Sequence, residues 1–371
     1  ARAITDYFVK RSDLINPRMP NRLNIYFAGC PECAEEAQIN DIGFVPVRRE
    51  TEIGFESWVG GSLGANPRRG YKMRDFITPA EVLPVCQAVF EIHTKHGIRT
   101  KGKSRLKFLI EAWGIEKFTA EFDRVFAEKR SLPENKHFRI PDSTDSEQGP
   151  SRLAQGWTRV TAPAMDGQVP NAPGMAEGIR PPAASASLPD GCYRQKQHGY
   201  VRVVLDVTLG EIRPAQLRTV ADLARRHGNG EVRFTKDQDI EFHWIKARHV
   251  ERLARELKEA GMVLKGRKTN VRVTACVGTE FCIYAATNSQ GAARDILKEF
   301  RPDDPRKADL LKGLTISVSG CPNSCAKQQV ADIGLVGQLA ALGEERRFSY
   351  NLSICGTIEK DKGRISIGEV V

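Results

Sequence analysis

Apolar residues recur with helix-like and strand-like periods between residues 199 and 276. Two segments have helical spacing, Pro214–His227 and Ala247–Ala260, and each is followed by a glycine. Four segments have the short apolar or alternating pattern of strands: Val201–Leu209, Glu231–Thr235, Ile240–Trp244 and Asn270–Ala275. The order strand, helix, strand, strand, helix, strand predicts the split β-α-β motif of the ferredoxin-like fold.

Apolar patterns elsewhere predict two further elements and one irregular stretch. Ala80–His96 has the spacing of a helix, and Leu314–Ser319 is an apolar, strand-like run that resembles Asn270–Ala275. Residues 131–190 combine many prolines with clusters of Ser, Thr and Asp, which predicts a linker with little regular structure.

Four cysteines form two close pairs, and each pair directly follows one of the strand-like runs that end at residues 275 and 319. The pairs read Cys276-Val-Gly-Thr-Glu-Phe-Cys282 and Cys321-Pro-Asn-Ser-Cys325. Two strand-to-loop turns could deliver four thiolates to one iron–sulfur cube. Zinc is the weaker alternative, because neither gap has the two residues typical of a structural zinc knuckle. The odd count of nine cysteines and the lack of a signal peptide disfavour disulfides.

At these residues the sequence resembles the siroheme-dependent sulfite and nitrite reductases, whose second cysteine motif reads much like Gly-Cys-Pro-Asn-Ser-Cys-Ala followed by Val-Ala-Asp-Ile-Gly. The resemblance implies a [4Fe–4S] cluster bound by Cys276, Cys282, Cys321 and Cys325. It gives Cys325 a second role, as the bridge to the siroheme iron. It also implies an α+β, pseudo-two-fold architecture, with a ferredoxin-like domain between two siroheme-type α/β halves.

A second copy of the Gly-Cys-Pro motif lies 291 residues upstream and indicates an internal duplication. The aligned segments are Gly29-Cys30-Pro31 with Gly320-Cys321-Pro322, and Asp41-Ile42-Gly43 with Asp332-Ile333-Gly334. In this register Ala34 lies opposite Cys325, so the first copy cannot present the same sulfur pair and we interpret it as structural. Cys30 and Cys33 as extra cluster ligands are the weaker alternative. The isolated cysteines, read as core or surface thiols, are Cys86, Cys192 and Cys355.

The resemblance predicts four consecutive regions. They are a first siroheme-type half at 1–130 without cluster ligands, the linker at 131–190, a ferredoxin-like domain at 191–267, and a second half at 268–371 with the cluster cysteines. Against the family plan, the chain reads as an internal portion of roughly two thirds of a complete member. It lacks the N-terminal ferredoxin-like domain, with two arginines that face the substrate, and the C-terminal end.

A basic segment, Arg99-Thr-Lys-Gly-Lys-Ser-Arg-Leu-Lys107, carries five cations in nine residues. A solvated basic surface is the ordinary interpretation of such a run. The resemblance instead places Arg105 and Lys107 at the distal face of siroheme, where arginine would orient an oxyanion and lysine would donate protons. Lys101 and Lys103 become candidates for binding the carboxylates of siroheme.

Weaker candidates for cofactor binding lie in the second half of the chain. They are Lys196, the signature residues Arg233, Thr235 and Gln238, and Asn288 with its neighbour Ser289. A surface lysine, a β-favouring threonine and a helix cap explain these residues equally well. His93, His96 and His243 have no second feature that would make them haem ligands.

The charge of the chain suggests anionic partners. The formal net charge is +10, but the basic residues are dispersed among acidic ones and no nucleic-acid-binding motif is present. A carboxylated cofactor, an oxyanion and an acidic donor protein explain the excess. No apolar run approaches the ~20 residues of a membrane span, so we expect a cytoplasmic protein, a monomer when complete.

The expected function is the six-electron reduction of sulfite to sulfide at a siroheme coupled to a [4Fe–4S] cluster, with electrons from ferredoxin or a flavoprotein. The first alternative is the same chemistry on nitrite, giving ammonia. Two alternatives come from other classes: a non-catalytic [4Fe–4S] electron carrier, and a basic nucleic-acid-binding protein with a structural metal.

Overall fold

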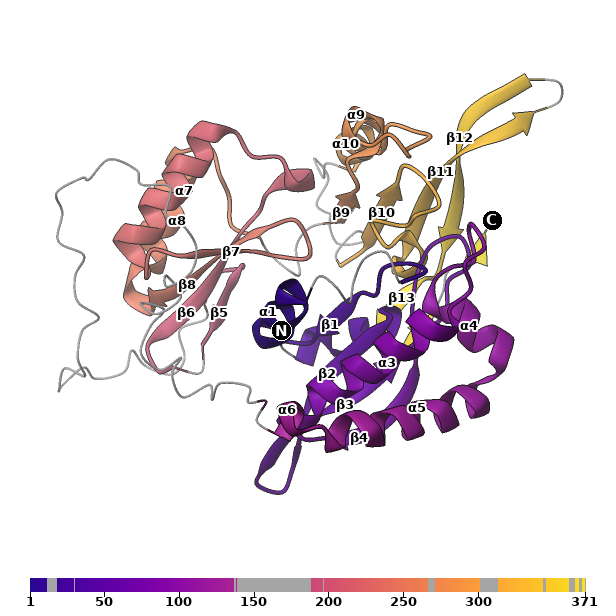
Figure 1. Ribbon diagram of the computed structural model, residues 1–371. Helices are drawn as coiled ribbons and strands as arrows, with labels where there is room; N and C mark the ends of the chain where they lie inside the picture. Colours follow the sequence, from indigo (N-terminus) through magenta and orange to yellow (C-terminus); the bar gives the residue numbers. More distant parts are fainter. Residues whose placement is uncertain are drawn as a thin grey trace. The chain divides into compact units, whose positions relative to one another are not determined.

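The computed structural model describes residues 1–11, 19–29, 31–136, 138, 188–195, 197–265, 271–300, 313–342, 345–359, 364–366 and 369–370. They form two compact units (Figure 1). Unit 1 comprises Ala1–Ile140, Ala275–Lys298 and Leu314–Val371, and unit 2 comprises Pro141–Thr274 and Glu299–Gly313. Cys30, Lys196 and most of the predicted linker lie outside the described residues.

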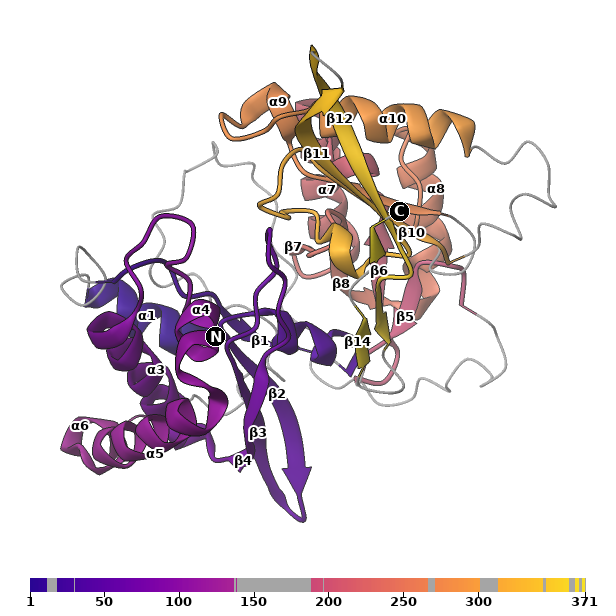
Figure 2. The same cartoon turned by 90° about the vertical axis from the view of Figure 1, so that its right-hand side faces the viewer.

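The first part of unit 1 is a four-stranded sheet with helices on one side. The strands, in spatial order, are β1 (Ile25–Phe27), β2 (Ile42–Arg49), β3 (Glu52–Val59) and β4 (Tyr71–Ile77). The helices are α1 (Arg2–Lys10), α3 (Val82–His96), α4 (Leu106–Trp113), α5 (Ile115–Ser131) and α6 (Pro133–Lys136), with the 3-10 helices η1 (Pro31–Ile39) and η2 (Pro79–Glu81). Figure 2 shows α3, α4 and α5 together on one side of the sheet. The predicted helix Ala80–His96 is confirmed by α3.

Fully buried aromatic and aliphatic side chains join this sheet to its helices. Phe44 of β2 and Phe118 and Phe122 of α5 have no exposed surface, and Leu106 and Leu109 of α4 are equally inaccessible. Burial of a large apolar side chain contributes about 1.5–3 kcal/mol, so this core fixes the start of α4 against α3 and α5. The basic residues at that start are thereby held in place.

The second part of unit 1 is a five-stranded sheet. Its spatial order is β15 (Glu369–Val370), β12 (Glu345–Ile354), β11 (Ile333–Leu342), β10 (Thr315–Ser319) and β9 (Arg272–Ala275). Of β9, only Ala275 lies within the ranges of unit 1. Its other elements are α9 (Gly278–Phe281), α10 (Ser289–Glu299), the 3-10 helix η6 (Gln328–Val330) and the small pair β13 (Thr357–Glu359) and β14 (Arg364–Ser366). Figure 1 shows β11 and β12 as a long hairpin that extends beyond the rest of the sheet. The predicted strand Leu314–Ser319 is confirmed by β10.

The two parts of unit 1 repeat one strand register at the offset found in the sequence. Ile25 of β1 pairs in parallel with Ile42 of β2, and Ile316 of β10 pairs in parallel with Ile333 of β11. Ile316 and Ile333 each lie 291 residues after their counterparts, Ile25 and Ile42. The internal duplication therefore extends from motif to backbone pairing.

A glycine at the same position in each copy permits this repeated arrangement. A Cβ atom on Gly43 would lie 2.2 Å from the carbonyl oxygen of Ala37, and one on Gly334 would lie 2.2 Å from that of Gln328. No side chain can be accommodated at such a distance, so both copies need glycine where the 3-10 segment crosses the strand. The Asp-Ile-Gly motif that the copies share owes its glycine to this contact.

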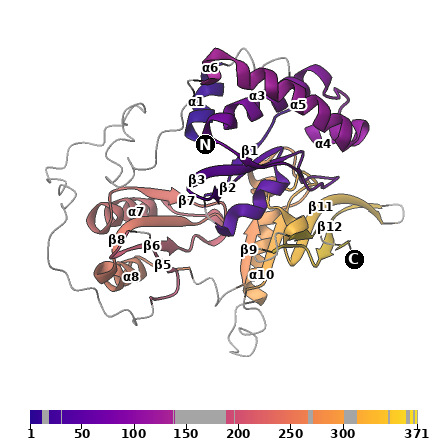
Figure 3. The same ribbon diagram turned by 90° about the horizontal axis from the view of Figure 1, so that it is seen from below.

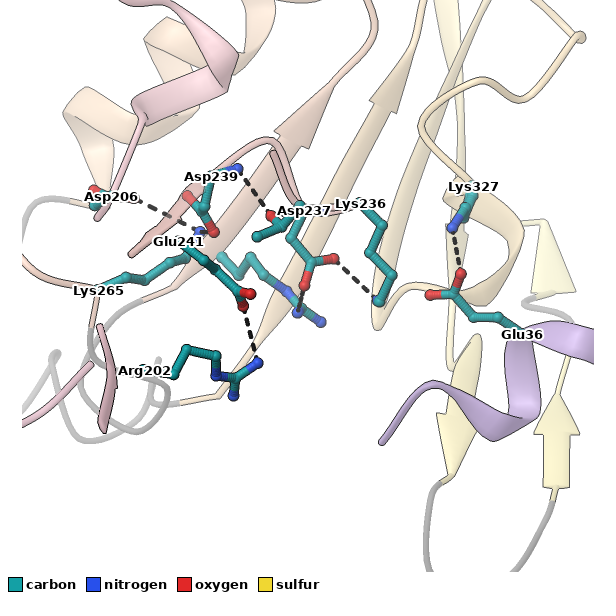
Figure 4. Close-up of polar contacts among 11 residues, drawn as sticks. Glu36, Arg202, Asp206, Lys236, Asp237, Asp239, Glu241, Lys265 and Lys327 are labelled. Carbon is teal, nitrogen blue, oxygen red and sulfur yellow. Dashed lines mark hydrogen bonds and ion pairs between the residues drawn. The ribbon is translucent and has the colours of Figure 1, made fainter. Parts of the chain in front are cut away.

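One ion pair joins a residue to its own counterpart in the other copy. Lys327 donates to Glu36 with an Nζ–Oε2 distance of 2.7 Å, and the two positions are 291 residues apart (Figure 4). Glu36 is buried, whereas the Lys327 side chain is 37% exposed. Equivalent positions of two copies meet only at the axis that relates them, so this pair marks the pseudo-two-fold axis of unit 1.

Unit 2 is a four-stranded antiparallel sheet with two helices on one face. The spatial order is β5 (Cys192–Arg194), β6 (Tyr200–Leu205), β8 (Ile240–Lys246) and β7 (Val232–Phe234). The helices are α7 (Pro214–His227) and α8 (Val250–Glu259), with the 3-10 helices η4 (Thr208–Gly210) and η5 (Ala247–His249). Figures 1 and 3 show both helices on the same face of the sheet. Lys265 ties the end of the unit to its sheet by an ion pair with Asp239, at 2.7 Å (Figure 4).

The sequence-based assignment of Asn270–Ala275 as the last strand of the ferredoxin-like motif is wrong. Strand β9 occupies this segment, but it belongs to the five-stranded sheet, beside β10. In unit 2 the place beside β6 is held instead by β5 and by Leu264, which forms an isolated antiparallel bridge with Leu205. An apolar run indicates a strand but not its partner, because partners are chosen by tertiary packing.

In the described residues, no helix combines the length and apolar character that crossing a membrane requires.

Candidate functional site

Both cysteine pairs of the predicted cluster lie at the same end of neighbouring strands in unit 1. The N–H of Cys276, the first residue after β9, donates to the carbonyl of Val318 in β10 at 3.1 Å. Helix α9 then leads to Cys282. Cys321 and Cys325 lie in the loop between β10 and η6. The two strand-to-loop turns thus bring both pairs to one edge of the sheet.

The sulfur of Cys276 is already surrounded by hydrogen-bonding groups. The backbone N–H of Gly320 donates to it at 3.1 Å, and the hydroxyl of Ser289 lies 3.2 Å from it while donating to the Cys276 carbonyl at 2.8 Å. Ser289 is fully buried. A backbone N–H aimed at a ligating sulfur tunes the potential of a bound cluster.

The other three thiols act on the thiol of Cys325. Cys325 is exposed, but the protein around its sulfur raises the pKa of its thiol by partial burial, and the thiols of Cys276, Cys321 and Cys282 raise it further. Four sulfurs that repel one another as thiolates need shared positive charge. The iron ions of a [4Fe–4S] cube supply such charge, so the donor set fits this cluster.

Among the described residues, no three His, Cys, Asp or Glu side chains converge as the ligands of a single metal ion do. A cube has a different requirement, because each of its four thiolates binds a separate iron atom.

Arg105 and Lys107 lie at the start of α4, also in unit 1. Arg105 precedes the helix, and its guanidinium pairs with the fully buried carboxylate of Asp41, with an Nη2–Oδ2 distance of 2.5 Å. Asp41 in turn accepts the N–H of Asn24 at 2.8 Å. The guanidinium of Arg105 is therefore bound by Asp41, the residue just before β2, which also binds the residue just before β1.

Lys107 is buried, with 5% of its surface exposed. Its ammonium donates to the carbonyl oxygens of Leu63, at 3.0 Å, and Asn66, at 2.5 Å. Burial lowers the pKa of Lys107 to about 8, and the charges of Arg105 and Arg68 contribute to the decrease. An amine with this pKa can give up and regain a proton near neutral pH.

The weaker candidates have local contacts of their own. Lys101 and Lys103 are exposed on the turn before α4. In unit 2, the Thr235 hydroxyl accepts the N–H groups of Asp237, at 3.2 Å, and Asp239, at 3.0 Å, and so shapes the β7–β8 turn. Two other candidates also lie on this hairpin, Arg233 exposed in β7 and Gln238 at a positive φ of 68°.

Asn288 caps α10 through its side-chain oxygen, which accepts the N–H of Gly291 at 2.8 Å. This hydrogen bond supports the interpretation of Asn288 as a helix cap. Its neighbour Ser289 is the residue that lies against Cys276.

The sequence reasoning missed Arg22, whose charge acts on Cys325 and partly opposes the rise in that thiol's pKa. Arg22 is exposed. Together with Asn21 it borders an apolar cavity of about 580 Å³ between α1 and β1, lined mainly by Ile4, Phe8, Leu23, Ile25 and Phe27. The alignment of the two copies offers one signal for Arg22: the charge is not shared, because the matching position in the second copy is Gly313.

Two protein-family models match the chain. The model described as "Nitrite and sulphite reductase 4Fe-4S domain" matches residues 1–130 and 266–366, and the "Nitrite/Sulfite reductase ferredoxin-like half domain" matches residues 193–260. The segments follow one another as two halves with a ferredoxin-like domain between them.

Individual relatives bear both substrate names. The chain is 28% identical over 352 residues to "Sulfite reductase [ferredoxin] 2" of Mycolicibacterium paratuberculosis, covering 93% of this chain and 55% of the relative. It is also 28% identical over 355 residues to the "Assimilatory ferredoxin-dependent nitrite reductase" of Haloferax mediterranei, covering 94% and 55%. The chain thus spans about half the length of the curated relatives it matches.

A solved structure shares the fold. The NirA protein of Mycobacterium tuberculosis is 26% identical, with a TM-score of 0.66, and the match covers 95% of this chain and 56% of NirA. The expected α+β architecture and the expected cofactors, siroheme and a [4Fe–4S] cluster, are confirmed at the level of the family. Because the first family model alone covers more than half of the chain, the chain belongs to the nitrite and sulphite reductase family of oxidoreductases.

Proposed function

We propose that the protein containing this chain carries out the six-electron reduction of sulfite to sulfide, with nitrite to ammonia as the alternative. The observation that carries the proposal is the gathering of four thiols at one sheet edge, with Cys325 under the influence of the other three. When bound, the siroheme and the cube would supply a binding site for the oxyanion and a path for single electrons. The remaining work falls to side chains.

The cysteines would hold the cube in a defined electrostatic setting. Cys276, Cys282, Cys321 and Cys325 are the proposed ligands, and Cys325, the exposed one, is the proposed link to the macrocycle. The N–H of Gly320 would remain directed at Cys276 and keep one corner of the cube in place. A shared sulfur would leave no solvent gap in the electron path.

Cations near the cysteines would neutralise the oxyanion. Arg22 is the strongest candidate, because it is exposed and its charge lies close enough to affect the pKa of Cys325. Lys107, with its pKa of about 8, stays the predicted proton donor, and Arg105 stays the predicted orienting residue. Both would act on substrate only after exchanging their present contacts with Asn66, Leu63 and Asp41.

Charge favours sulfite by a small margin. Sulfite is a dianion and nitrite a monoanion, so the larger charge gains more from two or more nearby cations. The electron donor is proposed to be ferredoxin, the donor in the names of two of the relatives, or a flavoprotein. A cytoplasmic, monomeric protein without nucleic-acid partners stays a prediction.

The test uses the full-length protein, purified with its cofactors. Absorption spectra should show siroheme bands that shift when sulfite or nitrite is added under reducing conditions. Turnover with reduced ferredoxin should have a higher kcat/KM for sulfite than for nitrite. The reverse ratio would assign the enzyme to nitrite. Cluster absorption without siroheme bands, and no turnover of either anion, would overturn the proposal in favour of an electron carrier.

A further inference from the structure

The cysteine loop is held by a loop from the other copy. Residues Ser62 and Arg68 close that loop by an antiparallel bridge. Between them, both backbone groups of Gly64 are bound by side chains of the second copy. The Gly64 N–H donates to the hydroxyl of Ser324 at 3.2 Å, and its carbonyl accepts from the Gln329 amide at 2.9 Å.

Ser324 lies between Cys321 and Cys325, immediately before the proposed bridging cysteine. It is 5% exposed and has a φ of 62°, a left-handed conformation that costs a non-glycine residue about 1 kcal/mol or more. Its hydroxyl accepts from Gln329 at 2.5 Å and from Gln328 at 3.0 Å, and it donates to the carbonyl of Pro322 at 3.1 Å. Such a conformation persists only where surrounding contacts enforce it.

The opposite side of the same loop is bound by Lys107. Its ammonium donates to Leu63 and Asn66, the residues on either side of the Gly64 segment. Gly64 has a φ of 102°, which an L side chain rarely adopts, so the loop shape needs glycine there. A continuous line of hydrogen bonds therefore runs from the start of α4, through the 62–68 loop, to Ser324.

We infer that this line of contacts, which we call the strap, fixes the backbone in front of Cys325 and so sets the position of its sulfur. Gln329 then acts as a positioning residue, working through Gly64 and Ser324. Lys107 supports the same loop through Leu63 and Asn66 whenever it is not engaged with substrate. The inference rests on the proposed function, in which Cys325 links the cluster to the macrocycle. It gives the first copy, to which we assign no cluster ligand, a direct part in the geometry of the cluster.

The duplication supplies a matched control. Gln329 and Gln38 occupy the same position in the two copies, but only Gln329 reaches Gly64. We compare Gln329→Leu with Gln38→Leu in the full-length protein loaded with both cofactors. Amide hydrogen exchange at residues 324–327 should accelerate in Gln329→Leu alone, because the Gly64 carbonyl and the Ser324 hydroxyl lose a donor.

Spectroscopy of the same samples reports on the sulfur itself. Gln329→Leu should keep its iron and siroheme content but show a heterogeneous exchange-coupled electron paramagnetic resonance signal. Its kcat should fall by up to about 10²-fold at constant KM, the size of loss expected when a reacting group is misplaced by about 1 Å. Gln38→Leu should match the wild type in all three measurements.

Two substitutions of Ser324 separate hydrogen bonding from backbone strain. Ser324→Ala and Ser324→Gly both remove the hydroxyl, but only glycine adopts the positive φ without cost. If the strap acts through the hydroxyl, both variants should show the altered signal. A normal signal in Ser324→Gly would show that strain alone mattered, and the strap would be refuted.

Failure of this inference differs from failure of the proposed function. If the wild type binds both cofactors and Gln329→Leu behaves as Gln38→Leu does, the strap is refuted and the reductase function stands. If the wild type binds neither cofactor, the reductase function fails. Faster exchange in Gln329→Leu alone would still establish the strap as a restraint on the cysteine loop.

Discussion

At the scale of single residues, the four cysteines stay predicted ligands, proposed from two close pairs that each follow a strand-like run. The structure places each pair after a strand, β9 or β10, as the pattern predicted. Arg22 was not predicted, because about 300 residues separate it from Cys325 and only folding brings its charge to that thiol. The partners of Arg105 and Lys107 escaped prediction for the same reason.

Cys325→Ser should uncouple the cluster from the macrocycle. Serine oxygen is a poor substitute for the sulfur in its proposed role as the link between cluster and macrocycle, so the coupled spectrum should vanish and sulfite turnover should be lost. Electron paramagnetic resonance and an iron assay on the full-length protein measure both effects. Normal iron content together with full sulfite reduction would show that another residue forms the link.

Lys107→Met should change how stability depends on pH. The folded-state pKa of Lys107 is about 8, below its ordinary value of 10.5, so between these values the unfolded chain binds a proton that the folded chain does not. Wild-type stability should therefore rise relative to Lys107→Met from pH 8 to 10, by up to about 1.4 kcal/mol per unit of pKa shift. Thermal unfolding midpoints at pH 7, 8, 9 and 10 provide the comparison. Parallel curves would mean that Lys107 is not desolvated in the folded protein.

At the scale of elements, periodicity predicted helices well and strand partners poorly. α7 has the predicted bounds, and β10 differs from its prediction by one residue. The predicted strand Val201–Leu209 ends early, at Leu205, because the chain turns into η4, where Leu209 has a positive φ. Such a turn depends on contacts with the Asp239 carboxylate, which accepts the N–H of Val207 at 3.2 Å, and a local pattern does not reveal that contact.

Glu256 links the two helices of unit 2 and should make them sensitive to acid. Burial alone would raise the pKa of Glu256, but hydrogen bonds from Arg252, His227 and Arg226 lower it to about 2. The carboxylate therefore contributes stability that is fully present above its unfolded pKa of about 4.5 and is lost as the pH falls toward 2. Glu256→Gln should lower stability by about 1 kcal/mol at pH 6, the scale of a partly exposed ion-pair network.

The control for this prediction is Glu259→Gln, a change of the same kind at an exposed position on α8. Circular dichroism during thermal unfolding at pH 6, 4 and 3 should show a gap between wild type and Glu256→Gln that narrows with acid. A gap of constant size would show that the charge of Glu256 is not responsible.

At the scale of the whole molecule, unit 1 consists of two unlike copies of one fold. The sequence offset of 291 predicted this relation, and the strand registers repeat it residue for residue. What the sequence could not show is where the copies meet. The contact between Glu36 and Lys327 became visible only in three dimensions, because an alignment places these residues at the same position rather than opposite each other.

Reversing this ion pair tests the axis. Glu36→Lys should destabilise unit 1 by roughly 3 kcal/mol, because it places two ammonium groups together at a partly buried position. Adding Lys327→Glu should recover most of the loss, since the double variant restores opposite charges with the order exchanged. Thermal unfolding of the four proteins in the cycle gives the coupling free energy. If adding Lys327→Glu restored none of the lost stability, the ion pair would not hold the two copies together at the axis.

The charges of this ion pair favour association between unlike copies over association between like ones. If two first copies associated about the same axis, Glu36 would face Glu36, and two second copies would set Lys327 against Lys327. Only the mixed arrangement brings acid to base. In a duplicated chain, each copy can associate wrongly with a like copy from a neighbouring molecule instead of with the unlike copy of its own chain. One opposed charge at the centre of the relation gives this protein a means to reject such exchanges while it folds.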